Sequence, residues 1–241
     1  MSVRNLKEAI KEEPRFPKKI ASIEVDEGTK EMYPLYPFVI SGGEHTEWFY
    51  FKHINNTTKY KLNIKPEYFG KESQYTEVFP MIVNEILKKN SDAVIFCVFD
   101  MDTIEGNFTR METHQEFEKK MRGKAVLCPS MPSIEYWFLL HFEDCCEFMN
   151  NWGKISNKLA PHIRHCFPIS KGVNLKKLLK KKKYLEDSQW VRELSKDGQL
   201  ELAIVRAEKN YLSSLKSGEL NRHSFTCVYK IFKTWSELIE N

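Results

Sequence analysis

The hydrophobic positions of the chain alternate between short apolar runs and helical stripes from residue 37 to about residue 142. Apolar runs at residues 38–41, 93–99 and 125–128 predict buried strands, and the alternating segment 60–65, which stops at Pro66, predicts an outer strand. Apolar residues three and four positions apart predict helices over residues 44–55, 76–89, 114–122 and 132–142.

These elements form four strand–helix units, a pattern that predicts an α/β fold with a parallel sheet and helices on both faces. Beyond residue 143 the strand signals fade, and apolar stripes predict helices, including a last one over residues 225–239. We therefore expect an N-terminal arm (1–36), an α/β domain (37–145) and a mostly helical C-terminal region (146–241).

The composition is that of a folded, soluble chain. Of the 241 residues, 41% are apolar, which is enough for a core. The longest apolar run, residues 93–99, is much shorter than the roughly 20 residues of a transmembrane helix. The first residues lack the apolar segment of a signal peptide. We expect a cytoplasmic protein without a membrane partner, whose six cysteines are free thiols.

Charge is concentrated in one segment. The formal net charge is +4, but residues 171–183 hold seven lysines and no acid, so the rest of the chain carries −3. Leu175, Leu178 and Leu179 interrupt the lysines at helical spacing, which predicts an amphipathic helix with its lysines outward. Such a segment suits the phosphates of a nucleic-acid backbone, although a solvated helix face would have the same pattern.

Two carboxylates follow the most apolar strand. Asp100 and Asp102 are two residues apart, so their side chains point to one face, at the edge where open α/β sheets bind ligands. Closely spaced carboxylates repel one another, and oxygen ligands of this kind suit Mg²⁺. The alternative is that both aspartates cap the following turn.

A third acid follows the next strand. We expect Ser130 to be an N-cap and Pro132 to lie in the first helical turn, which places Glu135 near the helix N-terminus. The helix dipole there favours an ionised carboxylate. Glu135 therefore either joins the site of Asp100 or only stabilises its own helix.

The exit of the first strand is a weaker candidate. Gly42 and Gly43 precede a helix start, where backbone N–H groups can bind an anion, but no nucleotide-binding signature is present. The group Cys145, Cys146 and 162–166 contains histidine and cysteine but lacks the spacing of a zinc finger.

Together these segments resemble the TOPRIM domain and, more narrowly, the RloB-like family of predicted nucleases of restriction and phage-defence loci. The resemblance rests on residues 43–51, on 99–102 and on the long motif at 130–142. It implies a TOPRIM-like fold and Mg²⁺- or Mn²⁺-dependent phosphodiester cleavage, with Asp100, Asp102 and Glu135 as metal ligands.

The sequence departs from the family pattern at one position. The pattern has a glutamate before Gly43, where this chain has Gly42. Either Glu44 or Glu47 takes over its catalytic role, or the nuclease is impaired. The alternative function is therefore a catalytically inactive TOPRIM-like module that binds nucleic acid or a partner in a defence complex. A nucleotidyl-transfer enzyme is a weaker alternative.

The resemblance also implies partners. DNA or RNA would be the substrate, with its backbone bound by the exposed lysines of the basic segment, which are Lys176, Lys177, Lys180, Lys181, Lys182 and Lys183. A partner ATPase, a phage-encoded trigger and a second copy of the chain remain open as further partners.

Overall fold

A computed structural model describes residues 36–42, 45–65, 75–102, 108–149, 151–167, 173–217 and 222–239. The expected N-terminal arm, Gly43 and Glu44 lie outside these residues. The core of the fold is a five-stranded sheet in the order β2-β1-β3-β4-β5, in which β5 alone is antiparallel to its neighbour. The strands are β1 (Phe38–Ser41), β2 (Asn63–Lys65), β3 (Ile95–Asp100), β4 (Val126–Met131) and β5 (Phe225–Thr226).

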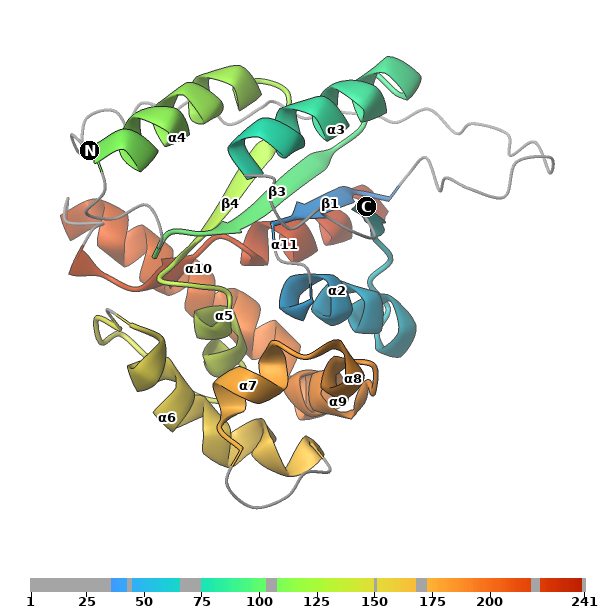
Figure 1. Cartoon of the computed structure of the whole chain (residues 1–241). Helices are drawn as coiled ribbons and strands as arrows, with labels where there is room; N and C mark the ends of the chain where they lie inside the picture. Colours follow the sequence, from blue (N-terminus) through green and yellow to red (C-terminus); the bar gives the residue numbers. More distant parts are fainter. Residues whose placement is uncertain are drawn as a thin grey trace, which may run out of the picture.

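Helices cover both faces of the sheet (Figure 1). The helices are α2 (Thr46–Thr57), α3 (Tyr75–Lys89), α4 (Phe108–Met121), α5 (Glu135–Leu140), α6 (Trp152–Ile163), α7 (Leu175–Leu179), α8 (Lys182–Leu185), α9 (Gln189–Ser195), α10 (Gln199–Ser217) and α11 (Tyr229–Ile239), with 3₁₀ turns η1 (Arg164–Cys166) and η2 (Lys196–Gly198). The α/β class, the mostly parallel sheet and the two helical layers are as the sequence predicts.

Alternation along the central strand decides which helices cover which face. In β3, Ile95, Cys97 and Phe99 pack with Phe79 of α3 and with α4, whereas Phe96 and Val98 face the cluster formed by α2, α5, α10 and α11. Side chains of a strand alternate between its faces, so Asp100 follows Phe96 and Val98 onto the side of α2 and α5.

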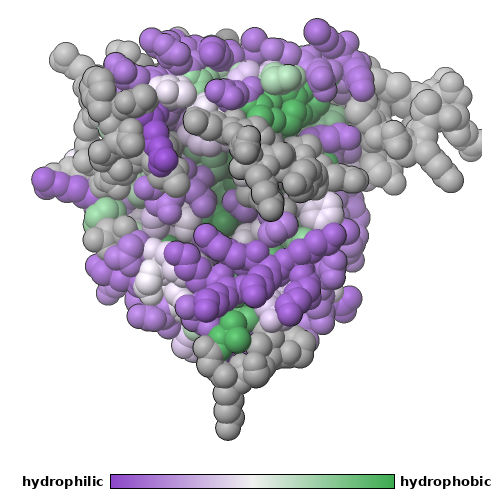
Figure 2. Space-filling view, viewed as in Figure 1, coloured by the Kyte–Doolittle hydropathy of each residue, from purple (hydrophilic) through white to green (hydrophobic). Residues whose placement is uncertain are grey.

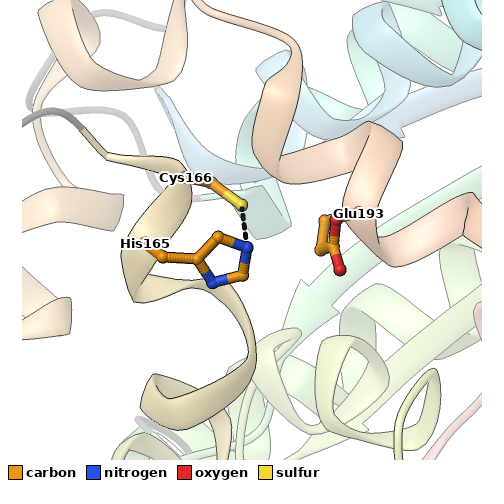
Figure 3. A group of neighbouring side chains, drawn as sticks. All are labelled: His165, Cys166 and Glu193. Carbon is orange, nitrogen blue, oxygen red and sulfur yellow. Dashed lines mark hydrogen bonds between the residues drawn. The ribbon is translucent and has the colours of Figure 1, made fainter.

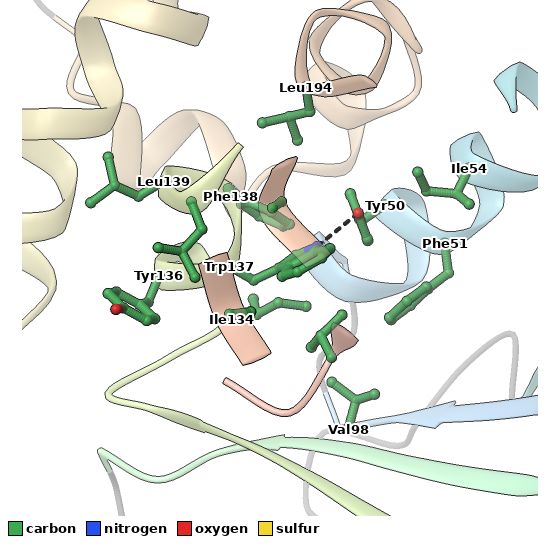
Figure 4. Packing of buried hydrophobic residues seen from close by; sticks show 14 of the residues in the cluster. Tyr50, Phe51, Ile54, Val98, Ile134, Tyr136, Trp137, Phe138, Leu139 and Leu194 are labelled. Atoms are coloured by element: carbon green, nitrogen blue, oxygen red, sulfur yellow. Dashed lines mark hydrogen bonds between the residues drawn. The ribbon is translucent and has the colours of Figure 1, made fainter. Parts of the chain in front are cut away.

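The larger core is built on aromatic side chains from α2 and α5. The indole N–H of Trp137 donates a 2.7 Å hydrogen bond to the Tyr50 hydroxyl, and both residues are fully buried (Figure 4). Trp137 also stacks on Phe232 of α11, while Tyr50 and Phe138 contact Trp190 of α9. The C-terminal helices are thereby packed against the two elements that carry Glu47 and Glu135.

The segment around Glu135 differs from its prediction. Ser130 is not an N-cap, because it belongs to β4, where its hydroxyl contacts that of Thr226 at 2.8 Å. Pro132 follows a cis peptide bond and precedes the helix, which begins at Glu135 and ends at Leu140. The apolar run that suggested a helix from residue 132 reflects burial on all sides rather than helical spacing.

Further boundaries also differ. The outer strand β2 begins at Asn63 rather than at residue 60. The C-terminal region contributes strand β5, and the last helix begins at Tyr229 rather than at residue 225; a strand of two residues carries no periodicity. Helix α4 begins at Phe108, six residues before the predicted start. The basic segment forms two short helices, α7 and α8, instead of one. The domain boundary at residue 145 stays a prediction, and one continuous core cluster includes residues from both sides of it.

Candidate functional site

Four acids lie at the carboxyl ends of the central strands, three of them in α2, β3 and α5 and one in the turn after β3. We call Glu47, Asp100, Asp102 and Glu135 the acidic cluster. Asp100 is the last residue of β3, Glu47 is in the first turn of α2, and Glu135 is the first residue of α5. The charges of the other three acids all act on the Asp100 carboxylate. The structure therefore brings together the acids that follow β1, β3 and β4, as expected of a parallel sheet.

Strand β4 and the loop after it hold the two aspartates in place. The Oδ1 atom of Asp100 accepts the backbone N–H of Ile134 at 2.9 Å. The backbone N–H of Asp102 donates to the carbonyl of Pro132 at 3.0 Å, and that of Met101 donates to the carbonyl of Ser130 at 2.9 Å. The turn after β3 is thus tied to the segment that leads into α5. The alternative that both aspartates cap the following turn concerns residues 103–107, which lie outside the described residues.

Burial raises the pKa of three members of the cluster. Glu47 and Glu135 are each only 8% exposed. Loss of hydration, with the charge of Glu135 adding to it, raises the pKa of Glu47 to about 7. Burial and then the charges of Glu47, Glu135 and Asp102 raise the pKa of Asp100 well above its ordinary range.

Glu135 shows that burial outweighs the expected effect of the helix start. Its Oε2 accepts a 2.5 Å hydrogen bond from the Ser133 hydroxyl, which favours the charged form. Burial nevertheless raises the pKa of Glu135 above its ordinary value. Burial thus has a larger effect on the pKa of Glu135 than the hydrogen bonds near the helix start, which lower it.

The basic segment reaches the acidic cluster at one residue. The Thr46 hydroxyl donates a hydrogen bond to the carbonyl of Leu179, which holds the end of α7 against the start of α2. The charge of the next residue, Lys180, lowers the pKa of both Glu47 and Glu135. Lys180 is exposed, so its ammonium faces both the cluster and solvent.

The other predicted lysines lie on the same surface. Leu175, Leu178 and Leu179 are buried, as the spacing predicts. The lysines at 176, 177 and 180–183 are exposed. Figure 2 shows hydrophilic side chains gathered in a band over the part of the molecule where Figure 1 places α7 and α8. The basic surface thus lies on the side of the sheet that carries α2 and α5.

The donor set of the cluster fits a hard divalent cation. All four members offer carboxylate oxygens, the ligands that Mg²⁺ prefers, and their shared repulsion is what a cation would relieve. Among the described residues the acids do not form a group of three with ligand atoms within 4.8 Å of one another. Mg²⁺ usually keeps several waters and binds one or two carboxylates directly, so it does not require three carboxylates in contact with it.

Gly42 lies at the end of β1 with space beside it. A Cβ atom there would lie 3.6 Å from Cβ of Tyr75 and 3.7 Å from Phe79, both on α3, at ordinary contact distances. Its backbone N–H donates to the carbonyl of Val98. A side chain at this position would start toward α3, whereas Glu47 lies on α2 beside Asp100.

Among the described residues, no helix is long and apolar enough to cross a membrane. No curated protein and no solved structure gives a significant match to the chain. The profile of the RloB-like protein family matches residues 38–234, from the first residue of β1 into α11. The match spans most of the chain and includes every residue of the acidic cluster. The chain therefore belongs to the RloB-like family.

Proposed function

We propose that this protein is a metal-dependent nuclease that hydrolyses phosphodiester bonds of DNA or RNA. The observation that carries the proposal is the convergence of acids from α2, β3 and α5 on the Asp100 carboxylate. Packing an acid beside acids is unfavourable unless a cation or proton compensates it. A bound divalent cation would supply this compensation, so a cation site explains why the acids lie together.

In this proposal Asp100, Asp102 and Glu135 hold Mg²⁺ or Mn²⁺. Asp100 is positioned by Ile134 and Glu135 by Ser133, so two of the three carboxylates have fixed orientations. Asp102 is exposed and can face an arriving substrate. The bound cation would supply a Lewis acid for the phosphoryl oxygen and for the charge of the leaving oxygen.

Glu47 is the candidate proton acceptor. It is buried beside Asp100, and its pKa of about 7 lies in the range suited to accepting a proton from water near neutral pH. Its place in the first turn of α2 lets it position that water beside Asp100. We assign to Glu47 the catalytic role that Gly42 cannot perform; Glu44, the other sequence candidate, lies outside the described residues.

Lys180 and the neighbouring lysines bind the substrate backbone in this proposal. Lys180 is the basic residue whose charge acts on the cluster, so it would hold the phosphate next to the reacting one. The exposed lysines of α7 and α8 would bind further phosphates without selecting a sequence. A role in anti-phage defence belongs to the same proposal and rests on the resemblance of the three motifs to the RloB-like family.

Cleavage assays on matched variants test the proposal. Duplex DNA, single-stranded DNA and tRNA are incubated with Mg²⁺ or Mn²⁺ and the wild-type chain, Asp100→Asn, Glu47→Gln or Asp92→Asn. Asp92 is exposed at the turn before β3 and is the control. We expect cleavage by the wild type and Asp92→Asn and a loss of at least 100-fold in the other two. Equal cleavage by all four would refute the proposal.

The alternative is an inactive module that binds nucleic acid or a partner, and Gly42 favours it because the family pattern has an acid there. Both functions use the lysines, so nucleic-acid binding does not separate them. An inactive module would cleave none of the substrates, and its affinity for nucleic acid would not change in Asp100→Asn.

A further inference from the structure

A second group of metal-binding side chains lies away from the acidic cluster. His165 and Cys166 end the 3₁₀ turn η1, and Glu193 is on α9. One ligand atom from each residue lies within 4.8 Å of the other two (Figure 3). Among the described residues, no other three histidine, cysteine or acidic side chains bring their ligand atoms this close together.

The two ligand atoms on η1 are as far apart as sulfur and nitrogen ligands of one tetrahedral zinc ion. The Sγ atom of Cys166 lies 3.6 Å from Nε2 of His165. With Zn–S and Zn–N bonds of about 2.3 and 2.0–2.1 Å and a tetrahedral angle, sulfur and nitrogen ligands lie about 3.6 Å apart. Figure 3 shows the Glu193 side chain next to this pair, on the neighbouring helix α9.

Exposure and charge around the group are consistent with a metal site. Cys166 is buried, Glu193 is half-buried and His165 is exposed, so an ion can enter from solvent on the histidine side. Burial, followed by the charges of Glu193 and Asp187, raises the pKa of the Cys166 thiol to about 11. Asp187 is exposed, and its Oδ1 accepts the backbone N–H of Gln189. Two carboxylates beside a thiol give a negatively charged environment that attracts a cation.

Cys145 and Cys146, the other cysteines considered in the sequence, have different partners. The carbonyl of Cys145 accepts hydrogen bonds from Tyr136 and Asn210, and the thiol of Cys146 contacts Asp144 and Asn210. Neither cysteine belongs to the group around Cys166. The sequence placed residues 165 and 166 in a group that lacks the spacing of a zinc finger, and it gave no indication of Glu193.

We infer that His165, Cys166 and Glu193 bind a Zn²⁺-class ion through one nitrogen, one sulfur and one oxygen ligand. Water would complete the tetrahedron, and the thiol proton would leave to solvent on binding. A thiolate and an imidazole select a softer ion than the carboxylates of the acidic cluster do. The two sites would therefore bind different metals.

Such an ion would fasten η1 to α9. Helix α9 also carries Trp190, which packs on Tyr50 and Phe138. Zn²⁺ would thus stabilise the helical layer against which α2 and α5 pack, without entering the reaction. The inference is independent of the proposed function, because its readouts involve no cleavage.

Cobalt spectroscopy on the full chain tests the inference. Co²⁺ added to reduced, metal-free protein should give the visible bands of a tetrahedral ion and an ultraviolet thiolate charge-transfer band, and Zn²⁺ should displace it. His165→Asn changes an exposed residue, so its fold should survive; it should weaken Zn²⁺ binding at least tenfold, as should Glu193→Gln. Cys166→Ser should abolish the charge-transfer band.

Two control variants make the result specific. Cys146→Ser removes the exposed cysteine and Glu201→Gln an exposed glutamate of α10, and both should bind Zn²⁺ like the wild type. A Zn²⁺ concentration that just saturates the wild type should raise the unfolding temperature of the wild type and these controls more than that of His165→Asn. Absence of a thiolate band in the wild type, or its persistence in Cys166→Ser, would overturn the inference.

Discussion

The Oδ1 atom of Asp100 accepts the backbone N–H of Ile134 at 2.9 Å. This bond joins the end of the central strand to the residue before α5, and it fixes Asp100 relative to Glu135. The hydrogen bond uses one carboxylate oxygen. The second oxygen can still bind a cation. Asp100 can therefore both hold the end of β3 to the residue before α5 and serve as a metal ligand.

Replacement of Asp100 should separate these two roles. Asp100→Asn keeps an oxygen acceptor for Ile134, whereas Asp100→Ala leaves that N–H without a partner. We expect the alanine variant to be less stable than the asparagine variant by about 1–3 kcal/mol. Urea unfolding at constant pH measures the difference. Equal stabilities would show that the bond to Ile134 contributes nothing.

The stability of the metal-free protein should fall as pH rises through the acidic cluster. Burial raises the pKa of Glu47 from 4.5 to about 7. Between these values the unfolded chain has lost the Glu47 proton while the folded chain keeps it, so the free energy of unfolding decreases with pH. Thermal unfolding in buffers from about pH 4.5 to about pH 7.5 should show this slope, and Glu47→Gln should reduce it.

The same titration predicts when Mg²⁺ stabilises the fold. A cation binds the ionised carboxylates and competes with their protons. Mg²⁺ should therefore raise the unfolding temperature at about pH 8 and have little effect at about pH 5, with roughly 2–4 °C per kcal/mol of stabilisation. Glu85→Gln, on the exposed side of α3, should behave like the wild type. An equal Mg²⁺ effect at both pH values would contradict this account of the site.

Lys180 should contribute to nucleic-acid affinity through its charge. The substitution Lys180→Gln removes the charge and with it one phosphate contact. The slope of the logarithm of the association constant against the logarithm of the salt concentration should therefore become shallower by about one. Fluorescence anisotropy with a labelled duplex at several salt concentrations gives that slope. Lys88→Gln changes an exposed lysine of α3, on the opposite face of the sheet, and should leave the slope unchanged. Identical slopes for both variants would remove Lys180 from the interface.

Gly42 provides a test of which acid completes the site. The space around it accepts a Cβ atom, so Gly42→Glu and its neutral partner Gly42→Gln should both fold. The added side chain starts toward α3, on the other side of the strand end from Glu47. We therefore expect Mn²⁺ affinity and cleavage to change less than threefold in both variants. A large gain in the glutamate variant alone would identify position 42 as the missing catalytic acid.

The strands and the acids were the most predictable parts of the fold. An apolar run such as residues 93–99 has few alternatives to a central strand, and acids that end neighbouring parallel strands must meet at one edge. Glu47 was ambiguous because the sequence offers two glutamates after β1. Only the start of α2 at Thr46 places Glu47 beside Asp100.

Contacts between residues far apart in the chain could not be predicted from the sequence. Strand β5 exists because Thr226 pairs with Ser130 across the sheet, and two residues give no periodic signal. The group around Cys166 depends on Glu193, 27 positions later in the chain and on another helix. The contact of Thr46 with Leu179, which brings Lys180 to the acids, has the same origin. Tertiary packing decides these relationships.

Calorimetric titration of Mn²⁺ into the chain freed of Mg²⁺ and Mn²⁺ tests the central claim most directly, since the claim is that the acidic cluster is a cation site. The buffer is set at about pH 8, above the pKa of about 7 of Glu47, so that protons compete less with the cation. The titration is made with the wild type, Asp100→Asn, Glu135→Gln and the control Asp92→Asn. Zn²⁺-loaded protein is used so that the group around Cys166 is already filled. We predict one binding event in the wild type and in Asp92→Asn, and at least tenfold weaker binding in the other two variants. Undiminished Mn²⁺ binding in Asp100→Asn and Glu135→Gln, or no binding by the wild type, would contradict the account.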